Sequence, residues 1–171
     1  ARALLAEAGY ENGEGFPVVE YLYNTSDAHK AVAEALQYMW EEELGVKVTL
    51  NNQEWAAFLQ TRKDGDYSIA RNGWIADYND PISFLDMWMT GGGNNDAQYS
   101  NEEYDSLIKE AKTTTDVKER MELLHKAEDK IIGEDNALAP LYFYTQKYML
   151  ADGIEGMYYC PLGYFFFGYT H

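Results

Sequence analysis

The chain has 171 residues, of which 46% are hydrophobic and 15% aromatic, and this composition indicates a globular protein with a real core. Its formal net charge of −16 argues against nucleic acid or an anionic membrane as a partner, because both bind clustered lysine and arginine. The single cysteine excludes an internal disulfide, and no run of about 18 apolar residues predicts a membrane span.

The first part of the chain alternates between helical and strand patterns. Capping residues with helical spacing predict helices, and β-rich runs predict strands, in the order helix 1–9, strand 17–23, helix 25–44, strand 46–51, helix 54–62 and strand 67–72. This β-α-β-α-β order predicts an α/β fold with a mostly parallel sheet, right-handed crossovers and flanking helices.

The second part of the chain is mainly helical in pattern. A short helix is predicted at 82–89, followed by a polar, glycine-rich loop at 90–100. Two capping boxes, Ser100 with Glu103 and Asp116 with Glu119, predict the starts of two further helices. Residues 139–150 favour a strand, and the aromatic tail at 151–171 favours irregular structure or an edge strand. The missing initiator methionine suggests a fragment of a longer protein.

The ends of two predicted strands indicate where a ligand could bind. Parallel α/β sheets bind ligands beyond the carboxyl ends of their strands. The strand at 17–23 leads to His29 in the first turn of a helix, and the strand at 67–72 leads to Arg71 and Asp77. An arginine and a helix N-terminus both favour a carboxylate, whereas an aspartate favours an ammonium group. A ligand that carries both charges would match this layout.

Plainer interpretations of these residues stay open. Arg71 and Asp77 could pair with each other, His29 could be solvated, and the aromatic residues around them could belong to the core. No nucleophile elbow, phosphate-binding loop, dinucleotide fingerprint or metal-ligand spacing is present, so the sequence predicts no cofactor, no metal and no catalytic residue. With 29 acidic residues, a pair of catalytic carboxylates remains an alternative.

Four stretches of the chain resemble the C-terminal lobe of bacterial oligopeptide-binding proteins, which are extracytoplasmic solute receptors of ABC importers in the peptide/nickel family. They are YNTSDAHK at 23–30, RNGWIADYNDPISFL at 71–85, NNDAQYSNEEYDSLI at 94–108 and ERMELLHKAEDKI at 119–131. The resemblance covers essentially the whole chain. It implies one lobe of a type II periplasmic-binding-protein-like fold, residues 1–171, from which the N-terminal lobe is absent.

The resemblance also implies roles for individual residues. Asp77 corresponds to the aspartate that pairs with the α-amino group of the peptide. Arg71, His29 and Arg62 correspond to residues that serve the carboxyl ends of peptides of particular lengths. The aromatic residues that match pocket walls are Trp55, Trp74 and Tyr144. Ile75 stands where one pattern of the family has cysteine, which leaves the side-chain preference open.

The expected function is therefore extracytoplasmic capture of short peptides for delivery to an ABC permease, with no enzymatic activity and with a lipoprotein anchor or a periplasmic location. Two alternatives belong to other classes. A carbohydrate-binding protein would use exposed aromatic residues, of which the chain has 15 tyrosines and four tryptophans. A hydrolase would use two carboxylates, at least one with a raised pKa. A signalling rather than nutritional role is equally compatible with the sequence.

Overall fold

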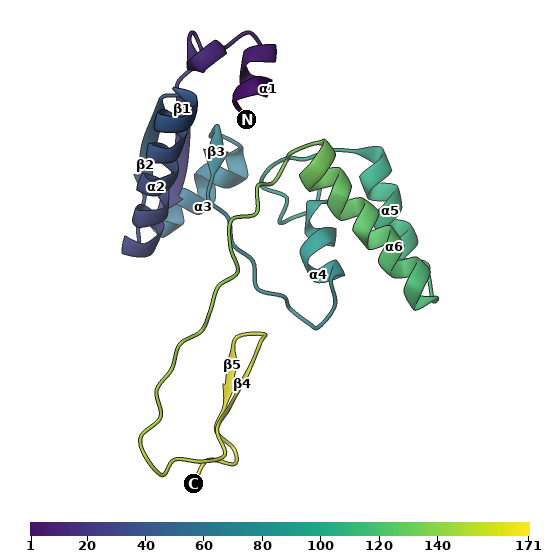
Figure 1. The fold of residues 1–171 in the computed structure, drawn as a ribbon. Helices are drawn as coiled ribbons and strands as arrows, with labels where there is room; N and C mark the ends of the chain where they lie inside the picture. The colour runs from purple at the N-terminus through teal and green to yellow at the C-terminus, as the bar shows by residue number, and fades with distance from the viewer. The chain divides into compact units, whose positions relative to one another are not determined.

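The computed structural model describes all residues, 1–171, and divides the chain into two compact units, Ala1–Gly73 and Trp74–His171 (Figure 1). The interpretation of residues 1–171 as a single lobe stays a prediction. The first unit is an α/β arrangement and the second is mainly helical. Their elements follow the order that the sequence predicts, with differences at helix starts and in the last third of the chain.

The first unit is built on a three-stranded parallel sheet with the order β2-β1-β3. Its strands are β1 (Val19–Asn24), β2 (Val48–Gln53) and β3 (Ile69–Ala70), the last much shorter than the predicted 67–72. The helices are α1 (Arg2–Glu7), α2 (Asp27–Leu44) and α3 (Trp55–Asp64), with a 3-10 turn at Glu11–Gly13. The predicted parallel sheet with flanking helices is confirmed.

Strand β1 is the centre of this unit because its neighbours pair on both sides. Its last four residues are buried, so both faces of the strand are covered, as expected for a parallel sheet. Tyr21 and Tyr23 pack in one core cluster with Ala33 of α2, and the ring of Trp40 lies edge-on to Tyr21 at 6.3 Å. Helix α2 therefore covers one face of the sheet.

Both ends of helix α2 have capping residues that stabilise them. Ser26 is the N-cap, and its Oγ accepts a hydrogen bond from the backbone N–H of His29 at 3.5 Å. Gly45 ends the helix with φ 69°, a left-handed conformation that glycine adopts without steric cost. A Cβ atom there would lie 2.1 Å from the carbonyl oxygen of Asn12, so the close approach of this chain segment also requires glycine.

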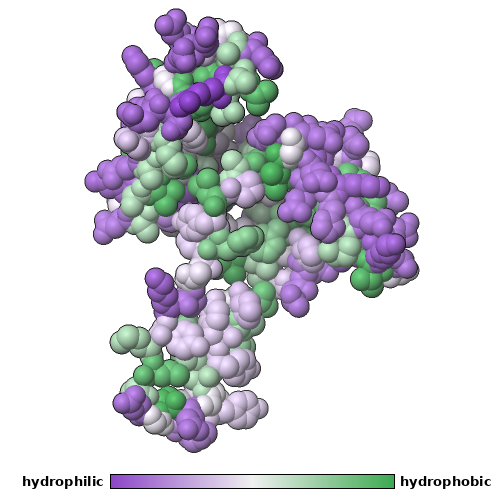
Figure 2. Space-filling model, in the orientation of Figure 1, coloured by the Kyte–Doolittle hydropathy of each residue, from purple (hydrophilic) through white to green (hydrophobic).

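The second unit packs its helices around an apolar cluster. It contains α4 (Ile82–Leu85), a 3-10 turn at Asp86–Trp88, α5 (Glu102–Thr113) and α6 (Val117–Glu128), which continues as a π-helix over Asp129–Glu134. The side chains at the centre are almost fully buried, whereas the visible outer surface of α5 and α6 is mainly hydrophilic (Figure 2). The buried residues of this cluster include Trp88, Tyr104, Ile108, Leu124 and Ile131.

The start of α5 differs from the capping box predicted at Ser100. The N-cap is Asn101, whose side-chain oxygen accepts hydrogen bonds from the backbone N–H groups of Glu103 and Tyr104 at 2.9 and 3.1 Å. Asparagine caps at least as well as serine, so the cap moves one residue along the chain. The cap predicted at Asp116 is confirmed, because its carboxylate accepts from the backbone N–H of Glu119 at 2.9 Å.

The strand predicted at 139–150 is wrong, because these residues pair with no other strand. A β-rich sequence forms a strand only where a pleated, half-buried surface receives its side chains, and Phe143 is 98% exposed. The tail instead forms the antiparallel hairpin of β4 (Tyr158–Cys160) and β5 (Tyr164–Phe166), in which Tyr158 lies opposite Phe166 and their rings stack at 4.6 Å.

We predict that Asn101→Ala lowers the free energy of unfolding by about 1 kcal/mol or more, because it removes the cap of α5. It also removes the hydrogen bond of 2.7 Å from Asn101 Nδ2 to Asp135. Ser100→Ala is the matched control and should change stability little. Urea denaturation measures both variants. A larger loss for Ser100→Ala than for Asn101→Ala would contradict this assignment of the cap.

Candidate functional site

The carboxyl edge of the parallel sheet in the first unit brings together Asn24, His29 and Arg71, which we call the cationic edge. The backbone N–H of Arg71 donates to the carbonyl of Leu22 at 2.8 Å and so extends the pairing of β3 with β1. This bond places the Arg71 side chain beside the end of β1, where its Nη1 donates to the side-chain oxygen of Asn24 at 3.4 Å. The predicted proximity of these strand ends is therefore confirmed.

His29 lies in the first turn of α2 and is half-buried. Burial lowers the pKa of its imidazole below the usual 6.5, and the positive charge of Arg71 lowers it further. A backbone contact with Asn24 acts weakly in the opposite direction. His29 is consequently neutral near pH 7 and stands beside one fixed positive charge. An anion placed between the two side chains would be attracted by Arg71 and would favour protonation of His29.

A polar cavity of about 260 Å³ lies at the start of α2 in the same unit, lined by Tyr23, Thr25, Ser26, Asp27, Lys30 and Asn52. Thr25 Oγ1 lies 3.0 Å from Asn52 Oδ1 and 3.0 Å from a carboxylate oxygen of Glu54, so hydroxyl and carboxylate groups gather where β1 and β2 end. This cavity adds polar lining to the edge at which the sequence predicts a ligand.

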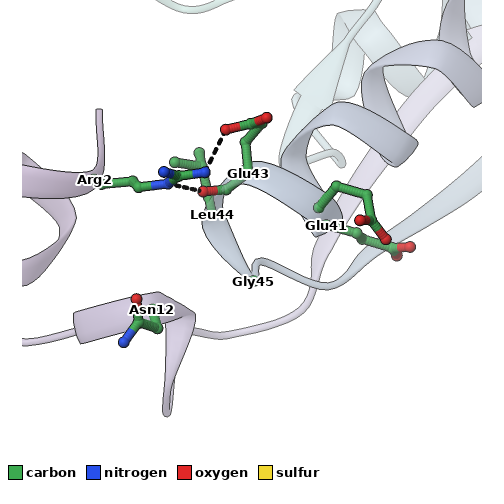
Figure 3. A pocket seen from close by; sticks show the side chains of 7 residues that line it. Arg2, Asn12, Glu41, Glu43, Leu44 and Gly45 are labelled. Carbon is green, nitrogen blue, oxygen red and sulfur yellow. Dashed lines mark hydrogen bonds and ion pairs between the residues drawn. The ribbon is translucent and has the colours of Figure 1, made fainter.

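A second cavity of about 290 Å³ lies at the opposite end of α2 (Figure 3). Three of its charged groups, those of Arg2, Glu41 and Glu43, bind other parts of the protein. The guanidinium of Arg2 binds the carboxylate and the carbonyl of Glu43, and Glu41 accepts from the backbone N–H of Val48 at 3.3 Å. These contacts fasten α1 and β2 to α2, which is a structural role, and none of the predicted site residues lines this cavity.

Helix α3 carries two further predicted site residues, Trp55 and Arg62. Trp55 is 53% exposed and its ring stacks on that of Phe58 at 5.8 Å. Arg62 is buried, with its guanidinium 5.3 Å from the centre of the Phe58 ring. A cation above an aromatic ring is held at that place by the ring's electrostatic field. The two residues thus share one aromatic support, although only Trp55 presents a large open surface.

Asp77, Trp74 and Tyr144 belong to the second unit. Asp77 is exposed, and its carboxylate makes neither a hydrogen bond nor an ion pair within that unit. Its backbone N–H donates to Oγ of the buried Ser83 at 2.9 Å. Trp74 packs partly against the apolar cluster, where its Nε1 donor is buried without a hydrogen-bond partner. Tyr144 is 59% exposed and contacts the ring of Tyr142.

Sequence reasoning missed the contribution of Asn24, which is 8% exposed at the last position of β1. The rule that strand ends carry ligand groups could have found it, because Asn24 lies between the predicted strand and the predicted helix. No group of three or more histidine, cysteine, aspartate or glutamate side chains is arranged to hold a metal ion. None of the helices combines the length and apolar character needed to cross a membrane.

Comparison with known proteins places this architecture in a family. Residues 1–96 match the family described as bacterial extracellular solute-binding proteins, family 5, middle part. The chain belongs to this family. Its fold is accordingly of the type II periplasmic-binding-protein-like class, with a parallel sheet flanked by helices.

Two curated relatives illustrate the likeness to this family. The chain is 41% identical over 154 residues to the oligopeptide-binding protein OppA of Bacillus subtilis, and this match covers 90% of the chain and 28% of the relative. It is 41% identical over 156 residues to the periplasmic oligopeptide-binding protein OppA of Salmonella typhimurium, covering 91% of the chain and 28% of the relative. The chain therefore spans less than a third of the length of these solute-binding proteins.

Solved structures of related proteins show the same fold. Haemophilus influenzae OppA in complex with the peptide RPPGFSPFR matches with a TM-score of 0.77 and 38% identity, over 83% of this chain and 28% of that one. The substrate-binding domain of an oligopeptide ABC transporter from Bacillus anthracis matches with a TM-score of 0.81 and 30% identity, over 99% of this chain and 33% of that one.

We predict that the His29 imidazole titrates below pH 6.5, and that Arg71→Met raises its pKa without restoring the ordinary value, because burial is the larger cause. Because the folded state disfavours protonation of His29, this residue lowers the free energy of unfolding only as the pH falls below about 6.5. Ring-proton NMR measures the titration, with His29→Gln to assign the signal and Lys30→Met as the matched control. An unchanged midpoint in Arg71→Met would contradict the coupling.

Proposed function

We propose that the protein to which this chain belongs captures oligopeptides outside the cytoplasm and delivers them to an ABC permease. The observation that carries this proposal is the likeness to a solute-binding relative solved with a peptide, at 38% identity over 83% of the chain. The chain's own charges support it. A free peptide has an ammonium group at one end and a carboxylate at the other, and the chain offers charges of both signs.

The exposed carboxylate of Asp77 accepts the α-ammonium group of the peptide. A charge-assisted hydrogen bond of this kind needs an acceptor that is accessible and not already engaged, and Asp77 meets both conditions within its unit. The backbone hydrogen bond to Ser83 fixes the main chain at this residue, so the carboxylate is held on a defined support.

Arg71 and His29 receive the carboxylate of peptides whose length brings it to the cationic edge. Arg71 supplies the permanent charge, and His29 adds a donor when the carboxylate raises its pKa. Arg62 supports the same task from α3. Trp55, Trp74 and Tyr144 form walls for peptide side chains. In the whole protein this chain acts together with an N-terminal lobe, and extracytoplasmic placement with a lipid anchor completes the proposal.

The two alternative functions receive less support than peptide binding. A sugar-binding platform needs exposed aromatic rings, and the chain has several, Trp55 and Tyr164 among them, but the relatives reported above are described as oligopeptide-binding proteins. A carboxylate hydrolase needs a carboxyl group with a raised pKa. Hydrogen bonds from Arg120 and Tyr99 instead lower the pKa of Asp80 and Asp135, respectively. We therefore propose a binding protein without enzymatic activity.

We predict that Asp77→Ala in the full-length protein weakens binding of trialanine about 10- to 100-fold, since a hydrogen bond to a charged group is worth about 1.5–3 kcal/mol. Binding of N-acetyl-trialanine, which lacks the ammonium group, should change little. Asp152→Ala removes an exposed aspartate of the same unit and serves as the control. Calorimetry measures all pairs, and equal losses for both peptides would show that Asp77 is structural.

We also predict that the 171-residue chain alone binds trialanine weakly or not measurably. A two-lobed receptor closes over its ligand and shields the charged contacts from water, whereas one part leaves them solvated. Calorimetry of the isolated chain beside the full-length protein tests this expectation. Micromolar or tighter affinity of the isolated chain would mean that it contains a complete peptide site.

A further inference from the structure

The loop that carries Asp77 is fastened at two points to the helices of its own unit. At the first, the backbone N–H of Asp77 donates to Oγ of Ser83, which is 3% exposed in α4. At the second, three residues further on, one carboxylate oxygen of Asp80 accepts from the backbone N–H of Ile82 at 2.9 Å and from Arg120 at 2.8 Å. Asp80 therefore joins the loop to the start of α4 and to a side chain 40 residues away.

Arg120 makes two different contacts with one guanidinium group. It lies in the first turn of α6, and its Nε donates to the carbonyl of Ala111 near the end of α5 at 3.1 Å. Its Nη2 forms the ion pair with Asp80. Because the guanidinium is planar and rigid, binding one group with Nε fixes where Nη2 can bind another. One guanidinium group thereby links α5 and α6 to the loop that carries Asp77.

The two aspartates of this loop have different surroundings. Asp80 lies at an ion pair whose side chains are 29% and 23% exposed for Asp80 and Arg120, respectively, and Arg120 lowers the pKa of Asp80. Asp77 is exposed and has no such partner within the unit. Arg120 thus binds the aspartate that fixes the loop and leaves the other aspartate available.

We propose that Arg120 and Asp80 are positioning residues for Asp77, which determine how strongly the chain selects ligands with a free ammonium group. This proposal rests on the proposed function of Asp77. A carboxylate on a loop held at two points loses less conformational freedom when it binds a ligand, and preorganisation of this kind increases affinity. Breaking the Arg120–Asp80 pair leaves the Asp77 carboxylate chemically unchanged but removes the link between its loop and α6.

The test uses the full-length protein with trialanine and N-acetyl-trialanine as probes. We expect Arg120→Met to weaken trialanine binding about 5- to 30-fold, in line with couplings between residues of one network, and to leave N-acetyl-trialanine binding unchanged. Lys112→Met is the matched control, because it removes a lysine paired with Asp86 at 3.0 Å in the same unit. It should alter neither affinity.

The double variant Asp77→Ala with Arg120→Met decides whether Arg120 acts through Asp77. If it does, Arg120→Met costs nothing further once Asp77 is removed. Equal losses for both peptides, or a full additional loss in the double variant, would overturn the proposal. If Arg120→Met fails to fold, Asp80→Asn takes its place, because the amide oxygen still accepts from Ile82 while the negative charge toward Arg120 is lost.

The same data separate the two proposals. If Asp77→Ala fails to discriminate between the two peptides, the proposed role of Asp77 is wrong, and the positioning role is wrong with it. If Asp77→Ala discriminates but neither Arg120→Met nor Asp80→Asn changes trialanine binding, only the positioning role is wrong. A loss of thermal stability with unchanged affinities would likewise assign the Arg120–Asp80 pair to folding alone and overturn the inference.

Discussion

The parallel pairing of β3 with β1 is the constraint on which the cationic edge depends. Strands that run in the same direction end at the same edge of the sheet, and the bond from Arg71 N–H to the Leu22 carbonyl continues this pairing by one residue. Without it, Arg71 would have no fixed relation to Asn24 or to the first turn of α2. The electrostatic effect of Arg71 on His29 is thus a consequence of strand register.

The opposite charge is supported in another way. Asp77 lies in a loop without regular structure, which depends on helices for its shape. Ser83 of α4 and Arg120 of α6 hold this loop through a neutral hydrogen bond and an ion pair. The positive charge of Arg71 therefore rests on a sheet edge and the negative charge of Asp77 on a helical support, each stabilised by the packing of its own unit.

The sequence predicts the parts of this fold that depend on local pattern. The alternation of strands and helices gives the parallel sheet, and the end-of-strand rule gives His29 and Arg71. Its failures have physical reasons. Asn101 competes with Ser100 for the cap of α5, and residues 139–150 have strand propensity without a strand partner. The Arg120–Asp80 pair joins residues 40 positions apart, and no local pattern indicates such a contact.

In the proposed function, Asp77 holds the amino terminus of a bound peptide. A crystal structure of the full-length protein with trialanine tests it most directly, because it locates both ends of the ligand. We expect the peptide ammonium nitrogen to lie about 2.7–2.9 Å from a carboxylate oxygen of Asp77, the distance typical of a charge-assisted hydrogen bond. A bound peptide whose ammonium group contacts other residues, with the Asp77 carboxylate in solvent, would contradict it.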